Sequence, residues 1–277
     1  MDGHAEHSTL PELRRDGRVA RITLRDPARR NALDEASIAR LEAVIREAAA
    51  LCAKTDAAGN AVDVVVVAGE GAAFSSGFDL AACADEPRRV EPLLAGLSAC
   101  VRALRAVPAP VVARVQGAAL AGGCALLTGC DFVVVAPDSQ LGYPVHRIGI
   151  SPAVSAPSLF SRMGPRARAL MLSGEIVDGT RAAAEGLATH VARDAGSLDA
   201  EVESLVERLL SKGPQALRAT KAWIARIEEL GAGDLGRAPG RDEAAFRATR
   251  DASVALAAGD EFASMLRGFW NSRRGAR

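Results

Sequence analysis

The sequence is poor in aromatic residues, which make up 4% of its 277 residues. So few aromatic side chains argue against a platform on which nucleic-acid bases stack. The charges are also balanced, because the sequence has 34 basic and 34 acidic residues. No strong net charge attracts a polyanion. We therefore expect no nucleic-acid partner.

Long hydrophobic runs are missing as well. No apolar stretch reaches the roughly 18 residues that a membrane-spanning helix needs. Residues 1–8 carry acids and two histidines, His4 and His7, but no apolar segment typical of a signal peptide. We expect a cytoplasmic protein without a membrane partner, with residues 1–10 forming a flexible tail.

Cysteine is present but not in the patterns that bind metals or form frameworks. The five cysteines are Cys52, Cys83, Cys100, Cys124 and Cys130. Their number is odd and no C-x-x-C pair occurs, which argues against both a disulfide framework and a zinc site. We expect no metal, and cysteines that serve as small hydrophobic core residues.

Apolar periodicity predicts an α/β protein. Weak alternation at residues 19–24 and short valine-rich runs at 62–68, 111–115 and 132–136 are typical of buried strands. Helical spacing of apolar residues at 34–51, with Asp34 as N-cap, and at 90–104 predicts helices between these strands. Strand, helix, strand is a crossover unit.

After residue 178 the pattern predicts helices only. They are expected at residues 181–187, 198–210, 215–230, 242–256 and 261–270, with a glycine-rich loop at 231–240. Phe262, Phe269 and Trp270 on the last helix need a partner to bury them, which favours oligomerisation. We predict a core domain at 11–197 and a helical region at 198–277.

Two glycine-bearing turns carry the strongest functional signal. Residues 74–80 (FSSGFDL) and 116–124 (QGAALAGGC) each follow a predicted strand. Small residues let a ligand's carbonyl approach the main chain, so the two turns can aim two N–H groups at one oxygen, as in an oxyanion hole. The alternative is that glycine only eases a turn from strand to helix.

Four further segments accompany these turns, at residues 29–33 (RRNAL), 110–117, 130–131 and 186–187. In this order and spacing, the turns and segments resemble those of the crotonase superfamily of enoyl-CoA hydratases and isomerases. The resemblance implies a spiral of repeated ββα units and a C-terminal helical region that forms homotrimers, or hexamers built from two trimers. It also implies an acyl-CoA substrate of fatty acid metabolism, whose coenzyme A is part of the substrate, and no separate cofactor.

The resemblance also assigns site residues. It places the two oxyanion amides on Ser76 and Gly122 and a phosphate contact on Arg29 or its neighbour Arg30. The other substrate-binding positions that it implies are Gly77, Phe78, Asp79, Gly123 and Val145.

The sequence departs from the hydratases at both catalytic acids. The resemblance places one glutamate directly after Gly-Gly-Cys and the other after Gly-x-Pro, where this chain has Ala125 and Val145. Hydration needs a base that activates water and an acid that protonates the α-carbon. Ordinary hydratase activity is therefore not expected.

Two neighbouring residues are candidates for the missing proton chemistry. His146 follows Val145 and can act as an acid/base near neutral pH, unless it faces away from the pocket. Tyr143 can orient a substrate or a water, or it can simply cap the rim of an apolar pocket. The reaction stays open between isomerisation, decarboxylation and hydrolysis of a carbon–carbon bond, and the alternative is a catalytically inactive acyl-CoA binder.

Overall fold

The computed structural model describes residues 9–54, 61–83, 86–229, 250, 254, 259–262 and 264–267. The chain divides into two compact units, Met1–Glu207 and Arg208–Arg277, so the division falls inside helix α7 (Leu198–Leu210). The sequence had placed the boundary at the first residue of this helix. Most of the expected tail, the loop at 231–240, Phe269 and Trp270 lie outside the described residues.

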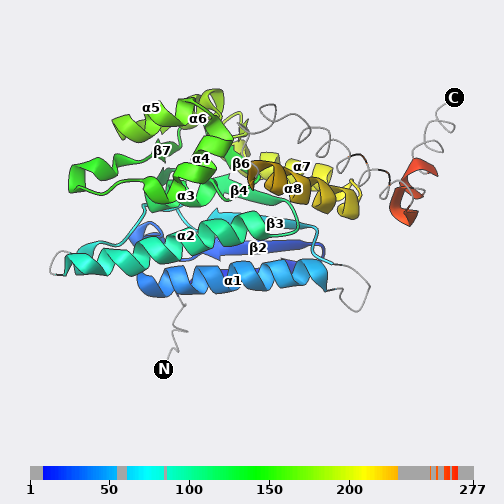
Figure 1. Cartoon of the computed structure of the whole chain (residues 1–277), viewed down its shortest axis with the longest axis horizontal. Helices are drawn as coiled ribbons and strands as arrows, with labels where there is room; N and C mark the ends of the chain where they lie inside the picture. Colours follow the sequence, from blue (N-terminus) through cyan, green and yellow to red (C-terminus); the bar gives the residue numbers. More distant parts are fainter. Residues whose placement is uncertain are drawn as a thin grey trace, which may run out of the picture. The chain divides into compact units, whose positions relative to one another are not determined.

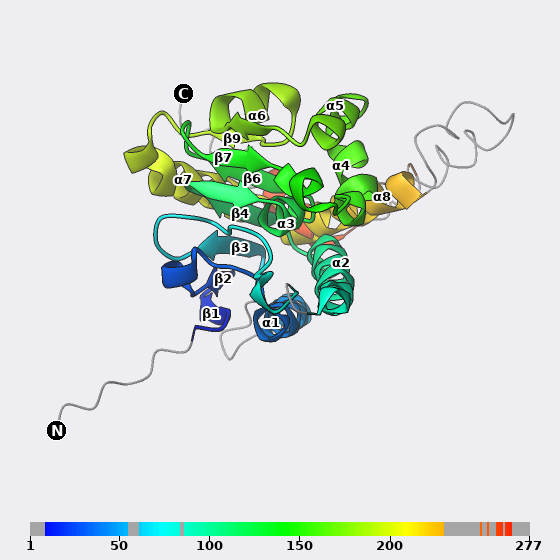
Figure 2. The same ribbon diagram turned by 90° about the vertical axis from the view of Figure 1, so that its left-hand side faces the viewer.

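The first unit is built on a six-stranded sheet with the order β1-β2-β3-β4-β6-β9 (Figure 2). The strands are β1 (Glu12–Asp16), β2 (Val19–Leu24), β3 (Val64–Gly69), β4 (Val111–Val115), β6 (Phe132–Val135) and β9 (His190–Val191). All neighbours pair in parallel except β1 and β2. The predicted strands are confirmed, but the prediction of helices only after residue 178 is wrong. Two residues of β9 are too few to leave a periodic signal.

A second, shorter sheet has the order β5-β7-β8. Its strands are β5 (Ala118–Leu120), β7 (Gln140–Gly142) and β8 (Ile176–Asp178). Single bridges extend this layer, Leu33 to Phe78 and Ser75 to Ala119. Each of the strands β2, β3, β4 and β6 is thus followed by a short extended segment and then by helical structure. This ββα unit repeats along the chain.

The helices predicted at 34–51, 90–104, 181–187 and 198–210 are found, whereas two helices between residues 156 and 173 are not among those predicted. The α-helices are α1 (Glu35–Ala53), α2 (Val90–Ala106), α3 (Gly122–Leu127), α4 (Ala156–Met163), α5 (Arg166–Ser173) and α6 (Gly179–Glu185). Short 3-10 turns are η1 (Pro27–Arg29), η2 (Ala81–Cys83), η3 (Pro87–Arg89), η4 (Pro144–Ile148), η5 (Ala153–Ser155) and η6 (Ala195–Ser197). Asp34 is the predicted N-cap of α1 and forms a capping box with Ser37.

Helices α1 and α2 lie side by side (Figure 1). Gly96 of α2 allows this approach, because a Cβ added there would lie 2.5 Å from Cγ2 of Ile38 on α1. The valines of β3 and β4 form the centre of the core and are almost fully buried. The first turns of α7 contact the sheet through ion pairs, Glu203 with Arg21 at 2.8 Å and Asp199 with Arg114.

The second unit contains helix α8 (Pro214–Glu229). Its first turn is held by the Glu261 carboxylate, which accepts hydrogen bonds from the N–H groups of Gln215 and Ala216 at 3.0 Å each. Phe262 is about half exposed. Among the residues that the structure describes, no helix combines the length and the apolar character needed to cross a bilayer.

Candidate active site

The two glycine turns are in direct contact. Ser75 N–H donates to Ala118 O, and Leu120 N–H donates back to Ser75 O, both at 3.0 Å. Gly123 permits this approach, because a Cβ there would lie 2.6 Å from Ser75 O. A Cβ added at Gly77 would come within 3.3 Å of the backbone nitrogen of Gly122.

In the first turn, the amides of residues 74–77 and 79 have acceptors, whereas those of Phe78 and Leu80 have none among the described residues. Ser76 N–H donates to Arg30 O at 2.9 Å, Gly77 N–H to Ser75 Oγ at 3.2 Å, and Asp79 N–H to Leu33 O at 3.0 Å. The Ser76 amide, which the sequence assigns to the oxyanion hole, thus already has an acceptor, whereas the Phe78 amide has none among the described residues.

In the second turn, Gly122 N–H is open, as are the next two amides at the start of the helix, those of Gly123 and Cys124. Gly122 begins α3, so its N–H has no intrahelical acceptor, and it has none elsewhere in the described chain. The preceding residue, Ala121, has φ 49° and ψ −111°, a conformation that residues with a Cβ rarely adopt. Ala121 N–H is fixed by Gly142 O at 2.8 Å. Local strain thus adjoins the open amide of Gly122.

Phe78 and Gly122, which carry two of the open amides, both line a cavity of about 180 Å³. Its walls come from the two turns, from α2 and from the segment that follows β7. The lining residues are Ser76, Phe78, Leu80, Leu94, Leu97, Ala121, Gly122, Ala125, Tyr143, Pro144, Val145, Ile148, Ile150, Ser151, Pro152, Val154 and Ser155. Most of them are apolar, which suits an acyl group.

The cavity brings together only some of the residues assigned from the sequence. Ser76, Phe78, Gly122, Tyr143 and Val145 line it. The residues that do not line it are Arg29, Gly77, Asp79, Gly123 and His146.

Ala125 and Val145, where the sequence resemblance leads one to expect glutamates, both belong to the wall. In the described part of the chain, no Asp, Glu, His, Lys or Arg side chain lines this cavity. Nor do the described residues gather three His, Cys, Asp or Glu side chains in a group able to hold a metal. The polar side chains of the wall are hydroxyl groups.

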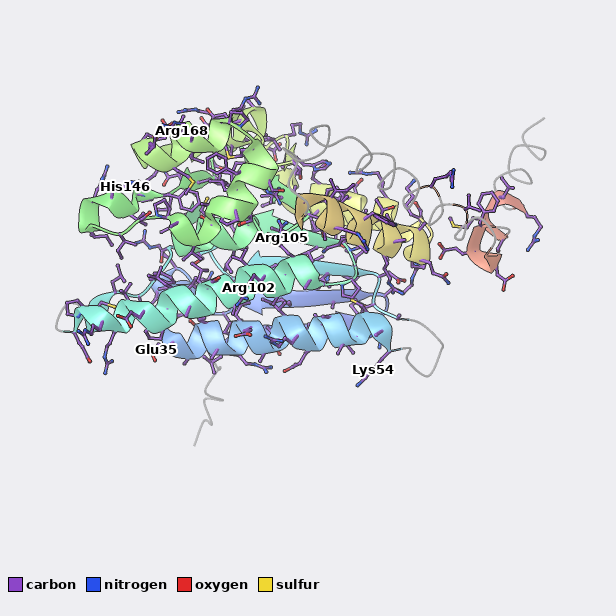
Figure 3. The ribbon with its side chains drawn as sticks, in the orientation of Figure 1. Glu35, Lys54, Arg102, Arg105, His146 and Arg168 are labelled. Carbon is purple, nitrogen blue, oxygen red and sulfur yellow. The ribbon has the colours of Figure 1, made fainter. Side chains whose placement is uncertain are left out.

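His146 lies on the exposed side of η4 (Figure 3). Its ring lies near Gly174, where an added Cβ would be 2.8 Å from His146 Nδ1. Val145 occupies the wall in its place. The structure therefore favours the alternative in which the histidine faces away from the pocket.

Tyr143 is buried, with 1% of its surface exposed. Its hydroxyl group lies near Cys124 and Ser155 but forms no well-oriented hydrogen bond with any described residue. Burial raises the pKa of Tyr143 well above its ordinary value, and burial likewise raises the pKa of Cys124 to about 12. Both groups thus stay protonated near neutral pH, and Cys124 is no thiolate nucleophile.

Arg29 is enclosed by carboxylates rather than open to a phosphate. Its guanidinium contacts Asp26 at 2.6 Å, Asp79 at 2.8 Å and Asp34 at 3.1 Å. The hydrogen bond to Asp34 is the main reason why the pKa of Arg29 is raised. The neighbouring Arg30 is exposed and its side chain has no partner among the described residues.

A spiral of ββα units with two open amides at an apolar cavity defines the class of protein, one with the crotonase fold. The sequence profile of the enoyl-CoA hydratase/isomerase family matches residues 14–231. The chain belongs to that family.

Similar proteins agree with this assignment. The chain is 33% identical over 245 residues to a Thermus thermophilus protein that bears an enoyl-CoA hydratase name. The alignment covers 85% of this chain and 91% of that relative. The structure of this chain is similar to that of an enoyl-CoA hydratase from Mycobacterium smegmatis, with a TM-score of 0.82 and 28% identity. The superposition covers 96% of this chain and 97% of that chain. Pseudomonas aeruginosa AtuE gives a TM-score of 0.82 at 29% identity, with the same coverage of both chains. The predicted fold is confirmed.

Proposed function

We propose that the cavity binds the acyl thioester of a coenzyme A ester, with the thioester oxygen between the N–H groups of Phe78 and Gly122. The observation that carries the proposal is that these two amides have no acceptor among the described residues and belong to residues that line the same apolar cavity. Two preorganised donors stabilise the negative charge of an enolate, and removing one such donor typically costs about 10² to 10³ in rate. Membership of the enoyl-CoA hydratase/isomerase family supports the choice of thioester.

The protein is proposed to work without the acid and base of a hydratase. Ala125 and Val145 can neither give nor take a proton, and each missing group typically contributes about 10² to 10⁴ in rate. Tyr143, with its raised pKa, remains a neutral hydrogen-bond donor near pH 7. A cavity of this kind stabilises an enolate but does not generate one by proton abstraction.

Decarboxylation is the enolate-forming reaction that fits such a cavity. When a malonyl-type thioester loses its carboxylate, the bond between the α-carbon and the carboxyl carbon breaks and its electron pair forms the enolate. Carbon dioxide leaves, and a proton from water ends on the α-carbon. No protein base is needed, and an apolar wall favours the loss of a carboxylate charge.

Arg30 replaces Arg29 as the proposed phosphate contact, because its guanidinium is exposed and has no described partner. We also propose that coenzyme A enters as part of the substrate with no further cofactor. A cytoplasmic homotrimer, or a hexamer of two trimers, remains the proposed assembly, supported by exposed apolar residues such as Phe262 and Leu266.

A catalytically inactive acyl-CoA binder is the second candidate. The observation that favours it is that hydroxyl groups are the only polar side chains in the wall of the cavity, as far as the chain is described. Such a protein binds the thioester and releases it unchanged.

The test combines binding with turnover. Cinnamoyl-CoA, whose absorption moves to longer wavelength when its carbonyl is polarised, reports on the two amides directly. We expect a red shift on binding, no hydration of crotonyl-CoA and release of carbon dioxide from methylmalonyl-CoA. Saturable binding with a red shift but no turnover would favour the binder, and binding without a red shift would exclude the proposed oxyanion hole.

A further inference from the structure

We propose that Arg29 is a positioning residue that holds the Phe78 amide in place, and not a ligand of the nucleotide phosphates. The inference rests on the proposed function, because the position of this amide matters only if it binds the thioester oxygen.

The peptide between Gly77 and Phe78 is fixed from one side. Its carbonyl oxygen accepts a hydrogen bond from Leu33 N–H at 2.8 Å. In a planar trans peptide the N–H points opposite to the C=O. The Phe78 N–H therefore points away from Leu33, and its direction depends on how the segment containing Leu33 is held.

Four further contacts join the same two segments. On the N-terminal side, Ser76 N–H donates to Arg30 O at 2.9 Å and Ser75 Oγ to Asn31 O at 2.8 Å. Ser76 Oγ lies 3.4 Å from Arg29 O as a further, longer contact. Asp79 N–H donates to Leu33 O at 3.0 Å. The first turn thus rests on residues 29–33.

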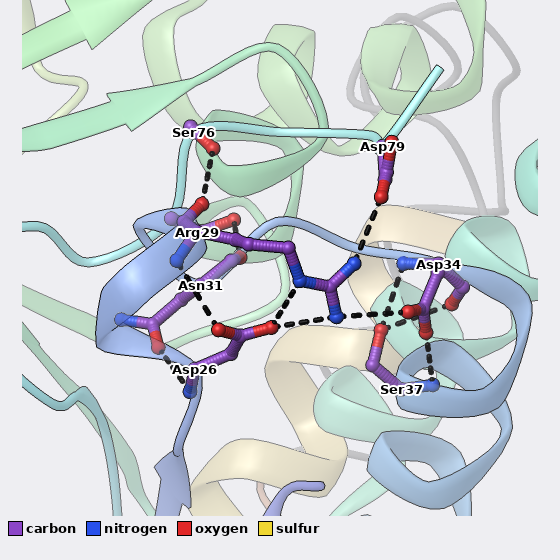
Figure 4. A network of polar contacts seen from close by, with 8 residues as sticks. Asp26, Arg29, Asn31, Asp34, Ser37, Ser76 and Asp79 are labelled. Carbon is purple, nitrogen blue, oxygen red and sulfur yellow. Dashed lines mark hydrogen bonds and ion pairs between the residues drawn. The ribbon is translucent and has the colours of Figure 1, made fainter. Parts of the chain in front are cut away.

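Side chains tie the two segments together just beyond this ladder. Asp34 follows Leu33 and Asp79 follows Phe78, so their carboxylates flank the last hydrogen bond of the ladder. Arg29 bridges the two through Nη2 to Asp34 at 3.1 Å and Nη1 to Asp79 at 2.8 Å (Figure 4). Its Nε donates to Asp26 at 2.6 Å, and Asp26 caps η1.

The charges make this bridge necessary. Three carboxylates surround one guanidinium, which leaves two negative charges unbalanced even with Arg29 in place. Without Arg29, Asp34 and Asp79 repel each other on either side of the ladder. The same excess of negative charge disfavours a phosphate at this guanidinium, whose Nε, Nη1 and Nη2 all already donate to carboxylates.

The test uses cinnamoyl-CoA and the cinnamoyl thioester of pantetheine, which lacks the nucleotide phosphates. In Arg29→Met we expect the red shift at saturation to fall by at least half for both thioesters, and the affinity for both to fall about equally, by roughly tenfold. The matched variant Arg30→Met should lose affinity for the CoA ester alone and keep the full shift. Arg40→Met, on the surface of α1, controls for the loss of one positive charge.

Two outcomes are decisive, and a second variant covers a failure to fold. A normal red shift in Arg29→Met, with affinity lost for the CoA ester only, would make Arg29 a phosphate ligand and overturn the inference. If the Met variant does not fold, Arg29→Lys replaces it, because one ammonium cannot span all three carboxylates and a reduced shift is still expected. Absence of any shift in the unmodified protein would instead contradict the proposed function.

Discussion

Ala121 N–H donates to Gly142 O at 2.8 Å, which links the residue before the second open amide to the end of strand β7. This bond helps to hold Ala121 at φ 49° and ψ −111°. A residue with a Cβ in such a sparsely populated region costs about 1 to 3 kcal/mol. The surrounding sheet therefore maintains a strained residue beside Gly122.

Replacement of Ala121 by glycine should relieve this strain. Glycine costs about 0.5 to 1 kcal/mol in chain entropy, which is less than the upper range of the strain. We expect the free energy of unfolding of Ala121→Gly, measured in urea, to be unchanged or higher than that of the unmodified protein. Ala121→Val should be clearly less stable because its Cβ is branched. A glycine variant that loses more than about 1 kcal/mol would show that the conformation is not strained.

Tyr143→Phe should stabilise the folded protein. A buried hydroxyl without a hydrogen bond costs about 1 to 3 kcal/mol, and phenylalanine keeps the ring while removing that group. Thr128→Val is the matched control, because Thr128 Oγ1 donates to Ala125 O at 2.7 Å and lies 2.6 Å from Ser158 Oγ. Denaturant midpoints should move in opposite directions in the two variants. A loss of stability in Tyr143→Phe would mean that Ser155, Cys124 or a buried water satisfies the hydroxyl.

The periodic elements could be predicted from the sequence. Weak alternation gives β2 its predicted bounds and a buried valine-rich run gives those of β4, and Asp34 marks the start of α1. Strand β9 could not be predicted, because two residues carry no period and their pairing with β6 depends on the fold.

The sequence predicts where the two turns of the site lie, but not which of their amides lack a hydrogen-bond acceptor. Small residues indicated where the main chain is open to a ligand, yet nothing in the sequence states which N–H already has an acceptor. Ser76 N–H is used by Arg30 O, which lies more than forty residues away, and only the fold reveals that bond. Arg29 looked like a phosphate ligand for a similar reason, since its carboxylate partner Asp79 is distant in the sequence.

The stability of the network around Asp34 should depend on pH. Burial acts to raise the pKa of this carboxyl group, but hydrogen bonds from Ser37 and Arg29 outweigh it, so the pKa lies below its ordinary 3.8. Because the pKa of Asp34 is lower in the folded than in the unfolded chain, its ionised form stabilises the fold at pH values above the unfolded pKa. This contribution is lost as the pH falls below about 3.8. In Asp34→Asn the N-cap is retained, so urea unfolding between pH 7 and pH 3 should show a smaller loss of stability than in the unmodified protein. Identical pH profiles would contradict the assignment.

His146→Ala should leave the site unchanged. The histidine is exposed on η4 and does not line the cavity, so we expect acyl-CoA affinity and any decarboxylation rate to stay within about twofold. The measurement is a titration with butyryl-CoA beside a turnover assay. A tenfold loss of rate at unchanged affinity would show instead that the ring enters the cavity when substrate is bound.

Restoring the two carboxylates tests the whole account of the site. Ala125 and Val145 both line the cavity, so Ala125→Glu combined with Val145→Glu places two carboxyl groups against its apolar wall. The apolar surroundings should raise the pKa of at least one of them, as an acid that works near neutral pH requires. We expect crotonyl-CoA hydration to rise by about 10² or more, since each acid/base group typically contributes about 10² to 10⁴.

The matched control is the pair Ala125→Gln and Val145→Gln, which has nearly the same size and cannot transfer protons. If the glutamate variant hydrates crotonyl-CoA and the glutamine variant does not, the missing acids alone account for the lack of hydration, and the amides of Phe78 and Gly122 are placed to polarise the thioester. If the glutamate variant folds and binds crotonyl-CoA but remains inactive, the amides do not hold the thioester oxygen as proposed, because the proton chemistry has then been supplied.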